Sequence, residues 1–327
     1  MAELEFHGRV AIVTGAGGGL GREYATFLAS RGARVVVNDI GGSMAGEGTD
    51  DGPAAAVVKA IRDSGGEAVA DTHSVATSEG GRAVVRTALD AFGQVDIVVN
   101  NAGILRDQPF DEMTPDQFGA VLDVHLGGAF HVTLPAWSVM REQGYGRVVN
   151  TTSAAGLLGS ARKSNYAAAK AGVVGLTRTL AVEGAELGIK VNAVAPIAAT
   201  RMLAGSMADA QSVGTNGRPL DPAALEMMNA ITRRLDPALV TPVMAYLAHE
   251  ECQVSGEVYT AGGGQVARFF VGRTRGYYNA ALSAEDVRDH LGAIRDETDC
   301  LVPADPGVEI AHLLRAVAAA ADRPLGG

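Results

Sequence analysis

The chain has 327 residues, of which 47% are hydrophobic and 20% charged, and it carries a formal net charge of −10. This balance is typical of a globular protein with a buried core, and the negative charge argues against a general surface for nucleic acid or anionic membranes. The two cysteines, Cys252 and Cys300, form neither a disulfide framework nor a metal-ligand spacing, so we expect a reducing compartment and no metal.

Apolar runs of strand length alternate with amphipathic runs of helix length from residue 9 to residue 264. The predicted strands are 9–15, 34–39, 67–75, 95–103, 146–153, 189–196 and 257–264. The predicted helices are 20–31, 53–64, one that ends at 92–93, and then 115–143, 165–187 and 237–250. The start of the fourth helix is the best marked, because Thr114 and Gln117 can form a capping box and Pro115 takes the first helical position.

Continuously apolar strands separated by helices predict a parallel sheet that is covered on both faces. We therefore predict an α/β fold, a doubly wound parallel sheet of the Rossmann type, in a single domain over residues 5–264. Residues 202–236 interrupt the alternation as a long polar insertion, which we interpret as a substrate loop. Residues 265–327 form a C-terminal extension with a helix predicted at 284–294 and an alanine-rich end.

A glycine-rich turn joins the first predicted strand to the first helix, in the sequence TGAGGGLGRE at 14–23. Glycines let the backbone turn tightly and approach a pyrophosphate, which then meets the positive end of the helix. The spacing is G-x-x-x-G-x-G and not the commoner G-x-G-x-x-G, but the strand–turn–helix context is the one that such a site needs. We predict that a dinucleotide binds along Gly15, Gly17, Gly18, Gly19, Leu20 and Gly21.

Asp39 ends the second predicted strand, 18 residues after Gly21. A carboxylate at this position can accept both hydroxyls of the adenosine ribose, and it repels a 2′-phosphate. Ile40 follows it, and no lysine or arginine lies within 15–21 to neutralise such a phosphate. The sequence therefore favours NAD over NADP. The alternative is that Asp39 is only a turn residue before Gly41 and Gly42.

Tyr166 and Lys170 stand four residues apart on the helix predicted at 165–187, in a chain with only four lysines. Residues at this spacing share a helix face, which is also common on solvated helices. Ser153 ends the preceding strand, and the carboxyl ends of parallel strands face one crevice. A phenol is a poor base at neutral pH, but a lysine one turn away and a positive nicotinamide ring favour the phenolate. We therefore predict Tyr166 as the catalytic base, Lys170 as the group that tunes it and holds the nicotinamide ribose, and Ser153 as the hydrogen bond to the substrate oxygen.

Four features together resemble the signature of the short-chain dehydrogenases/reductases: TGAGGGLG at 14–21, NNAG at 100–103, Ser153 and the Tyr166-x-x-x-Lys170 pair. The resemblance covers about residues 5–264. Within that family, VVVNDIGG at 35–42, NNAGILRD at 100–107, VHLGGAF at 124–130 and YGRVVNTTSAAGLLG at 145–159 are similar to the (3R)-hydroxyacyl-CoA dehydrogenase region of the peroxisomal multifunctional enzymes of type 2. That group is also classed with the 17β-hydroxysteroid dehydrogenases, as type 4.

The resemblance implies an NAD-dependent oxidation of a secondary alcohol to a ketone. For the multifunctional subgroup this is the oxidation of (3R)-3-hydroxyacyl-CoA to 3-oxoacyl-CoA in the β-oxidation of fatty-acyl or steroid side-chain CoA esters. The further cofactor contacts that it implies are Ser74, Val75, Asn101, Ala102, Gly103, Ile197 and Thr200. The first two of these would meet adenine, the next three the adenosine side, and the last two the nicotinamide amide.

Three positions depart from the pattern of the family or of the subgroup. His125 stands where most short-chain dehydrogenases have Asn, although the multifunctional subgroup is similar in having His. This residue either lines a proton route through its backbone carbonyl or fills the core, and we favour the core role for its imidazole. His73 stands where the subgroup usually has Asp, and Ile197 replaces the common Gly after Pro196.

Two other functions stay open on the sequence. A 17β-hydroxysteroid or other secondary-alcohol dehydrogenase would need a closed apolar pocket, and a non-catalytic NAD-binding protein would typically have lost the Tyr or the Lys. The chain enters its first strand without a signal-peptide pattern, and its most apolar run, 118–140, contains Asp123 and Pro135, so we predict no membrane span. We expect a soluble, cytoplasmic homodimer or homotetramer that acts on a small molecule, an acyl-CoA or a steroid.

Overall fold

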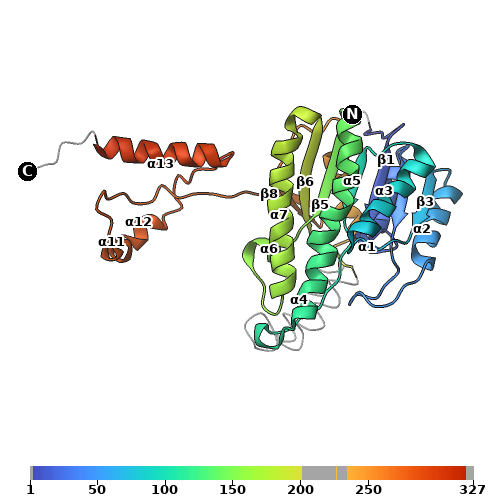
Figure 1. Ribbon diagram of the computed structural model, residues 1–327, viewed down its shortest axis with the longest axis horizontal. Helices are drawn as coiled ribbons and strands as arrows, with labels where there is room; N and C mark the ends of the chain where they lie inside the picture. The colour runs from blue at the N-terminus through green and yellow to red at the C-terminus, as the bar shows by residue number, and fades with distance from the viewer. Residues whose placement is uncertain (1–2, 201–225, 227–233, 322–327) are drawn as a thin grey trace, which may run out of the picture. The chain divides into compact units, whose positions relative to one another are not determined.

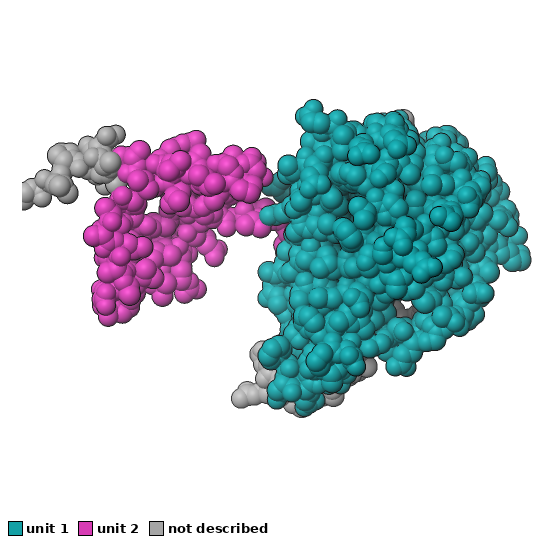
Figure 2. Space-filling view, viewed as in Figure 1, with its two compact units in different colours: residues 1–268 teal, residues 269–327 magenta. Residues whose placement is uncertain are grey.

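The computed structural model describes residues 3–200, 226 and 234–321. The chain forms two compact units, residues 1–268 and residues 269–327, which Figure 2 shows in separate colours. Most of the substrate loop predicted at 202–236 lies outside the described residues. Within the described part of the chain, no helix is both long and apolar enough to cross a membrane.

The first unit is built on an eight-stranded sheet with the order β3-β2-β1-β4-β5-β6-β7-β8 (Figure 1). Its strands are β1 (Val10–Thr14), β2 (Arg34–Asn38), β3 (Glu67–Asp71), β4 (Ile97–Asn100), β5 (Gly146–Thr151), β6 (Ile189–Pro196), β7 (Val258–Gly262) and β8 (Gln265–Phe269). Strands β1 to β7 pair in parallel. The doubly wound parallel sheet predicted from the sequence is therefore confirmed.

Helices cover both faces of this sheet, as Figure 1 shows. One face carries α1 (Gly19–Ser30), α2 (Gly52–Asp63) and α10 (Thr241–Ala248), and the other carries α3 (Ser78–Phe92), α5 (Gly128–Gln143) and α7 (Ser164–Gly184). The shorter elements are α4 (Pro115–Leu122), α6 (Ala154–Leu158), η1 (Phe110–Glu112), η3 (Ala185–Leu187) and η4 (Pro237–Leu239).

Alternate side chains of the strands enter two apolar cores, one under each layer of helices. Val13 of β1 packs in the first core with Leu28 of α1 and Met244 of α10, whereas Ile12 packs in the second with Met140 of α5. All residues of β1 are buried, which is why the strand is an almost continuous apolar run. Burying one side chain of this size contributes about 1.5–3 kcal/mol.

Three elements differ from those that the sequence predicts. The helix expected to run unbroken to residue 143 is interrupted by a π-helical turn, η2 (Asp123–Gly127). The strand β8 follows β7 across Gly263 and Gly264, whose φ values of 58° and 85° belong to the two-residue turns of antiparallel hairpins. The alanine-rich end, for which the sequence predicts no element, forms α13 (Pro306–Ala321).

The second unit contains the C-terminal helices. Two helices, α11 (Ala284–Asp289) and α12 (Leu291–Ile294), occupy the stretch that the sequence predicts as one helix. The ring of Tyr277 stacks on His290 between them, with centroids 3.9 Å apart. The predicted helical character of the extension is therefore present, but it is divided among three helices.

Arg147 is a buried arginine near the start of β5. Its guanidinium donates to the carbonyls of His249 and Glu250, just after α10, at 3.1 and 3.2 Å. It also donates to the carbonyls of Gly146 and Gly188 at 2.8 and 3.2 Å. A guanidinium carries five donors in a fixed fork, so one side chain links β5 to two loops at the amino end of the sheet.

We predict that Arg147→Met lowers the free energy of unfolding by about 2–4 kcal/mol, because several buried carbonyls lose their donor at once. Urea titration followed by circular dichroism measures this loss. The control is Arg82→Met, since Arg82 is exposed and donates only to Ser78 in the described structure, and a change below about 0.5 kcal/mol is expected there. Equal losses in the two variants would contradict the role given to Arg147.

Candidate active site

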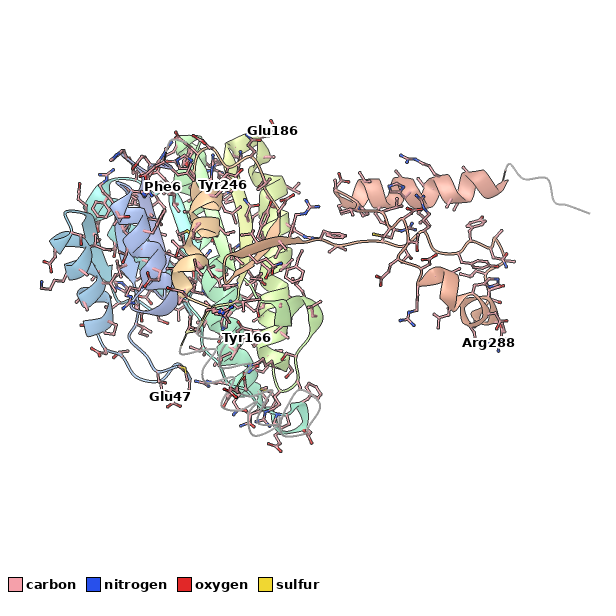
Figure 3. All side chains as sticks on the ribbon, turned by 180° about the vertical axis from the view of Figure 1, so that it is seen from behind. Phe6, Glu47, Tyr166, Glu186, Tyr246 and Arg288 are labelled. Carbon is pink, nitrogen blue, oxygen red and sulfur yellow. The ribbon has the colours of Figure 1, made fainter. Side chains whose placement is uncertain are left out.

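The residues predicted for the site gather at one end of the sheet, where the parallel strands finish. Figure 3 shows Tyr166 at the same end of the first unit as Glu47, which lies in the loop after β2, whereas Phe6 and Glu186 lie toward the opposite end. In a doubly wound sheet, ligands bind at the carboxyl ends of the strands. The arrangement therefore places the phosphate loop and the catalytic residues along one crevice.

Ser153 lies just beyond the carboxyl end of β5, where it caps α6. Its Oγ accepts a hydrogen bond from the backbone N–H of Ala155 at 3.2 Å. The same side chain lies beside the hydroxyl of Tyr166, where it acts to lower the pKa of the phenol. The helix cap therefore holds this hydroxyl in a fixed position beside the tyrosine.

Tyr166 stands in the first turn of α7 and is partly exposed. Burial raises the pKa of its hydroxyl, the neighbouring Ser153 acts in the opposite direction, and the charge of Asp107 adds to the rise. The protein's own groups thus favour the neutral phenol. The lowering predicted from the sequence therefore depends on the positive nicotinamide ring and on protonation of Lys170.

Lys170 lies one turn further along α7 and is buried. Its Nζ is 5.6 Å from the centre of the Tyr166 ring and donates to the carbonyl of Thr151 at 2.5 Å. Burial lowers the pKa of Lys170 to about 7, because an ammonium loses its hydration there. The structure thus brings the three predicted catalytic residues together, with a lysine that can change protonation near neutral pH.

His125 occupies the π-helical turn η2 between α4 and α5. Its Nε2 lies 3.1 Å from the backbone nitrogen and 2.8 Å from the carbonyl oxygen of Ile104, and its ring is edge-on to Tyr166 at 5.1 Å. Burial, together with the charge of Lys170, holds the pKa of the imidazole well below its ordinary value. The ring is neutral and packs under the loop after β4, which is the role that the sequence favours, and the π-turn is a common device at functional sites.

A small cavity of about 10 Å³ lies beside Lys170. Asn100, His125 and Thr151 contribute to its lining together with the lysine. That volume admits about one water molecule, and a lining of this polarity supplies hydrogen-bond partners. The buried ammonium therefore has space for one water beside it.

The glycine loop between β1 and α1 is shaped for close approach by a ligand. Gly15 and Gly19 have φ values of 63° and 52°, a backbone conformation that residues with a Cβ rarely adopt. A Cβ on Gly21 would lie 2.2 Å from the carbonyl of Gly15, and one on Gly17 would lie 2.8 Å from the carboxylate of Asp39. Helix α1 begins here without a side-chain cap, so its first N–H groups can bind a pyrophosphate. The loop therefore fits a dinucleotide.

Asp39 follows β2 and faces this loop. Its two carboxylate oxygens accept hydrogen bonds from the N–H groups of Gly17 at 2.8 Å and Gly41 at 2.7 Å. Gly41 has a φ of 69° and could not carry a Cβ, which would lie 1.9 Å from the carbonyl of Asp50. Asp39 thus stabilises the turn by hydrogen bonds and also places a carboxylate at the edge of the crevice.

Asn101 holds the loop after β4 against the glycine loop. Its amide donates to the carbonyls of Thr14 and Gly15 at 3.0 and 3.1 Å. In return, the hydroxyl of Thr14 accepts from the N–H groups of Asn101 and Ala102 at 3.0 and 3.1 Å. A Cβ on Gly103 would lie 2.3 Å from the His125 ring, so this loop is packed closely on both sides.

Ser74 and Val75 follow β3 in a segment that is packed closely against α3 and α5. The ring Nδ1 of His131 lies 3.0 Å from the carbonyl of Val75. A Cβ on Gly80 would lie 1.8 Å from the carbonyl of Ser74, and one on Gly128 would lie 2.9 Å from Val75. These contacts hold the segment in place. The contact between His131 and the Val75 carbonyl could not be predicted from the sequence pattern.

Ile197 and Thr200 lie after β6, on the other side of the glycine loop. The N–H of Ile197 donates to the carbonyl of Ala261 at 2.8 Å, and the residue is 47% exposed. The methyl group of Thr200 would be 3.6 Å from a Cβ on Gly19. The segment therefore borders the crevice, as expected for residues that meet the nicotinamide half.

Two charged residues beside the tyrosine are not predicted from the sequence. Asp107 and Lys163 form an ion pair whose side chains are only 10% and 16% exposed. The Nζ of Lys163 lies 5.8 Å from the centre of the Tyr166 ring. The scarcity of lysine in the chain is a signal that could have drawn attention to Lys163, whereas nothing in the local pattern singles out Asp107.

Comparisons with known proteins agree with this geometry. A family model described as short chain dehydrogenase matches residues 9–211. A putative short-chain type dehydrogenase/reductase of Mycobacterium tuberculosis is 49% identical over 289 residues, which are 88% of this chain and 94% of that protein.

Two solved structures are also similar. Full-length peroxisomal multifunctional enzyme type 2 from Drosophila melanogaster has a TM-score of 0.76 at 33% identity, over 97% of this chain and 50% of that chain. A 7α-hydroxysteroid dehydrogenase, solved with NADH and 7-oxo glycochenodeoxycholic acid, has a TM-score of 0.68 at 29% identity, over 81% of this chain and 98% of that chain. The chain thus spans half the length of the multifunctional enzyme, and the resemblance drawn from the sequence is confirmed.

We predict that Lys170→Met stabilises the cofactor-free protein at pH 6 by about 1–3 kcal/mol, because it removes a buried charge. The pKa of Lys170 falls from its ordinary value near 10.5 to about 7 on folding. Between these values the unfolded chain binds more protons than the folded one, so wild-type stability rises with pH across that window. The gain should therefore shrink toward zero near pH 10.

Urea titrations of both proteins at the two pH values measure this difference. Lys59→Met is the matched control, since the Lys59 side chain is 75% exposed, and it should change stability little at either pH. If Lys170→Met destabilised the protein more at pH 6 than at pH 10, the lysine would not be a buried charge with a lowered pKa.

Proposed function

Because the chain belongs to the short-chain dehydrogenase family, we propose that it oxidises a secondary alcohol to a ketone with NAD. The substrate that we propose is a (3R)-3-hydroxyacyl-CoA, which the enzyme converts to the 3-oxoacyl-CoA in the β-oxidation of fatty-acyl or steroid side-chain CoA esters. The observation that carries the proposal is that Ser153 and Lys170 both lie beside Tyr166: the serine acts to lower the pKa of its hydroxyl, and the buried Nζ of Lys170 is 5.6 Å from the centre of its ring.

Each of these residues has a role in the oxidation. The cofactor, when bound, accepts a hydride from the carbon that bears the hydroxyl. Tyr166 takes the hydroxyl proton, and Ser153 hydrogen-bonds to the same oxygen, so both act where charge develops. Lys170 favours the phenolate by its positive charge and holds the nicotinamide ribose, while the neutral ring of His125 packs beside the tyrosine.

The preference for NAD rests on Asp39. Its carboxylate is fixed at the crevice by two backbone N–H groups, where it can accept the ribose hydroxyls and repel a 2′-phosphate. Two close approaches support this cofactor site: a Cβ on Gly15 would lie 2.7 Å from Ala102, and one on Gly19 would lie 3.6 Å from Thr200. The solved relative that contains NADH supports a nicotinamide dinucleotide of this kind.

The acyl-CoA assignment is supported by the resemblance of the motif segments to the multifunctional subgroup and by the solved multifunctional enzyme. A second candidate is a hydroxysteroid, of the 17β class or another, because a solved relative is a 7α-hydroxysteroid dehydrogenase. We also infer a cytoplasmic homodimer or homotetramer. The assembly into an oligomer is supported by apolar surface on two helices, at the exposed Phe130 and Leu134 of α5 and Val182 of α7.

We predict NADH formation from NAD⁺ with a (3R)-3-hydroxyacyl-CoA, and little or none with its (3S) isomer or with a free 17β-hydroxysteroid, followed at 340 nm. Tyr166→Phe should lower kcat by about 10²–10⁴-fold while the affinity for NAD⁺ stays nearly unchanged, since only the proton transfer is lost. Turnover of the steroid alone would favour the second candidate. Full activity of the variant would overturn the role of Tyr166.

We predict that Asp39→Asn reduces the preference for NAD⁺ over NADP⁺, measured as the ratio of kcat/KM values, by about tenfold or more. The variant keeps the size of the side chain but removes the charge that repels the 2′-phosphate. Asp50→Asn, in the same loop, is the control and should leave the ratio unchanged. A wild-type enzyme that prefers NADP⁺ would contradict the assignment.

A further inference from the structure

An ion pair of low exposure lies beside Tyr166. Lys163 immediately precedes α7, and its Nζ pairs with Oδ2 of Asp107 in the loop after β4. The side chains of the lysine and the aspartate are 16% and 10% exposed, so both charges lie largely out of water. In the described part of the chain, the other carboxylate oxygen, Oδ1, is buried and accepts no hydrogen bond. A carboxylate in such surroundings depends on its cation, so Asp107 and Lys163 act as a unit.

Backbone and amide contacts hold this pair against the start of α7. The N–H of Gln108 donates to the carbonyl of Arg162 at 2.9 Å, and Arg162 has a φ of 64°, a conformation that residues with a Cβ rarely adopt. The amide of Asn165 donates to the carbonyl of Arg106 at 2.8 Å, and its oxygen accepts from the N–H of Tyr166 at 2.7 Å. The loop that carries the aspartate and the turn that carries the tyrosine are therefore tied together.

Two ammonium groups lie near the ring of the tyrosine. The Nζ of Lys163 is 5.8 Å from the ring centre, and the Nζ of Lys170 is 5.6 Å from it. The charge of Asp107 acts in the opposite sense, because it raises the pKa of the phenol. The carboxylate that fixes Lys163 thus also opposes the effect of the ammonium that it fixes.

In the described part of the chain, the other elements around the ring bring apolar or uncharged groups. The imidazole of His125 in η2 lies 5.1 Å away and is neutral, since burial lowers its pKa. Ser153 contributes a hydroxyl, and α4 contributes the apolar side chains of 120–122. The charged groups of this cluster are therefore two lysines and one aspartate.

The effect of an ion pair depends on how far away it is felt. A distant group responds to the nearly neutral sum, whereas a group beside the pair responds to each charge separately. Tyr166 is beside the pair, in surroundings that contain little water to screen it. Removal of either partner therefore leaves a single charge to act on the phenol, of opposite sign in the two cases.

We propose that Asp107 and Lys163 are positioning residues of the oxidation: the aspartate holds an ammonium at the Tyr166 ring and opposes its charge, so that the pair, together with Lys170, sets the pH range in which the phenol acts as base. The proposal rests on the proposed function in that Tyr166 is the base. A pair that only closed the loop onto α7 would leave this pH range unchanged.

The first test is the pH dependence of kcat/KM for a (3R)-3-hydroxyacyl-CoA at saturating NAD⁺. The rate falls on the acid side as the base becomes protonated. Asp107→Asn leaves the ammonium without its carboxylate, which favours the phenolate, and should move this limb down by about one pH unit. Lys163→Met leaves the carboxylate and should move the limb up by about as much. The double variant should return close to the wild type.

The matched control is Lys59→Met. Lys59 also pairs with an aspartate, but the side chains of that pair are 75% and 62% exposed. Its loss should therefore leave the limb in place. Lys163→Arg, which keeps the charge, should lie nearer to the wild type than Lys163→Met does.

A second measurement needs neither substrate nor cofactor. Protein labelled with ¹³C at the tyrosine Cζ is titrated by NMR, and the resonance of Tyr166 is the one that is missing in Tyr166→Phe. The phenol should ionise at the lowest pH in Asp107→Asn, then in the wild type, and at the highest pH in Lys163→Met. Thermal melting confirms that each variant is folded, and if Asp107→Asn does not fold, the displacement in Lys163→Met decides.

The outcomes separate the pair from the proposed function. Displacement of the two single variants in opposite directions supports the role of the pair. Displacement in a common direction, or none in either one, would overturn it, because a merely structural pair lowers activity without such a pattern. A wild type that does not oxidise the hydroxyacyl-CoA would overturn the proposed substrate, and the ¹³C titration would then still decide on the pair.

Discussion

The site depends first on the hydrogen bonds that join the ends of β1 and β4. These strands are parallel neighbours, yet the helices that follow them cover opposite faces of the sheet, so their loops diverge and open a crevice. Backbone groups exposed in such a gap need partners. Thr14 and Asn101 supply them across the gap. The Thr14 hydroxyl accepts from N–H groups of the loop after β4, and the Asn101 amide donates to carbonyls of the glycine loop. The glycine loop is therefore held in the shape that a pyrophosphate needs by contacts of the protein itself.

Burial is the second constraint, and it acts in the same sense on three groups around the reacting hydroxyl, those of Tyr166, Lys170 and His125. It raises the pKa of Tyr166 and lowers those of Lys170 and His125, and each shift favours the neutral form. A charge introduced into such surroundings interacts more strongly than it would in water. A positively charged nicotinamide, if bound beside Tyr166, would therefore favour the phenolate more strongly than it would in water.

Those parts of the fold and of the site that depend on local pattern could be predicted from the sequence. Continuous apolar strands, a glycine turn before a helix, and a Tyr and Lys one turn apart each carry their signal within a few residues. The features that the sequence does not reveal join distant positions: Arg147 and His249 are 102 residues apart, and Asp107 and Lys163 are 56 apart. The π-turn at His125 is local, but it shifts the helix by a single residue, and no residue type marks such a shift.

Each half of the crevice contains a side chain that a buried or largely buried carboxylate holds in place. On the adenosine side the buried Asp71 holds the ring of His73, and on the nicotinamide side the largely buried Asp107 holds Lys163 beside Tyr166. A carboxylate out of water must keep its hydrogen bonds, so its partner gains a fixed position that an exposed ion pair would not give it. Thr14 and Asn101 thus hold the glycine loop, whereas the two carboxylates hold single side chains, because the hydrogen bonds that a buried carboxylate keeps also fix its partner.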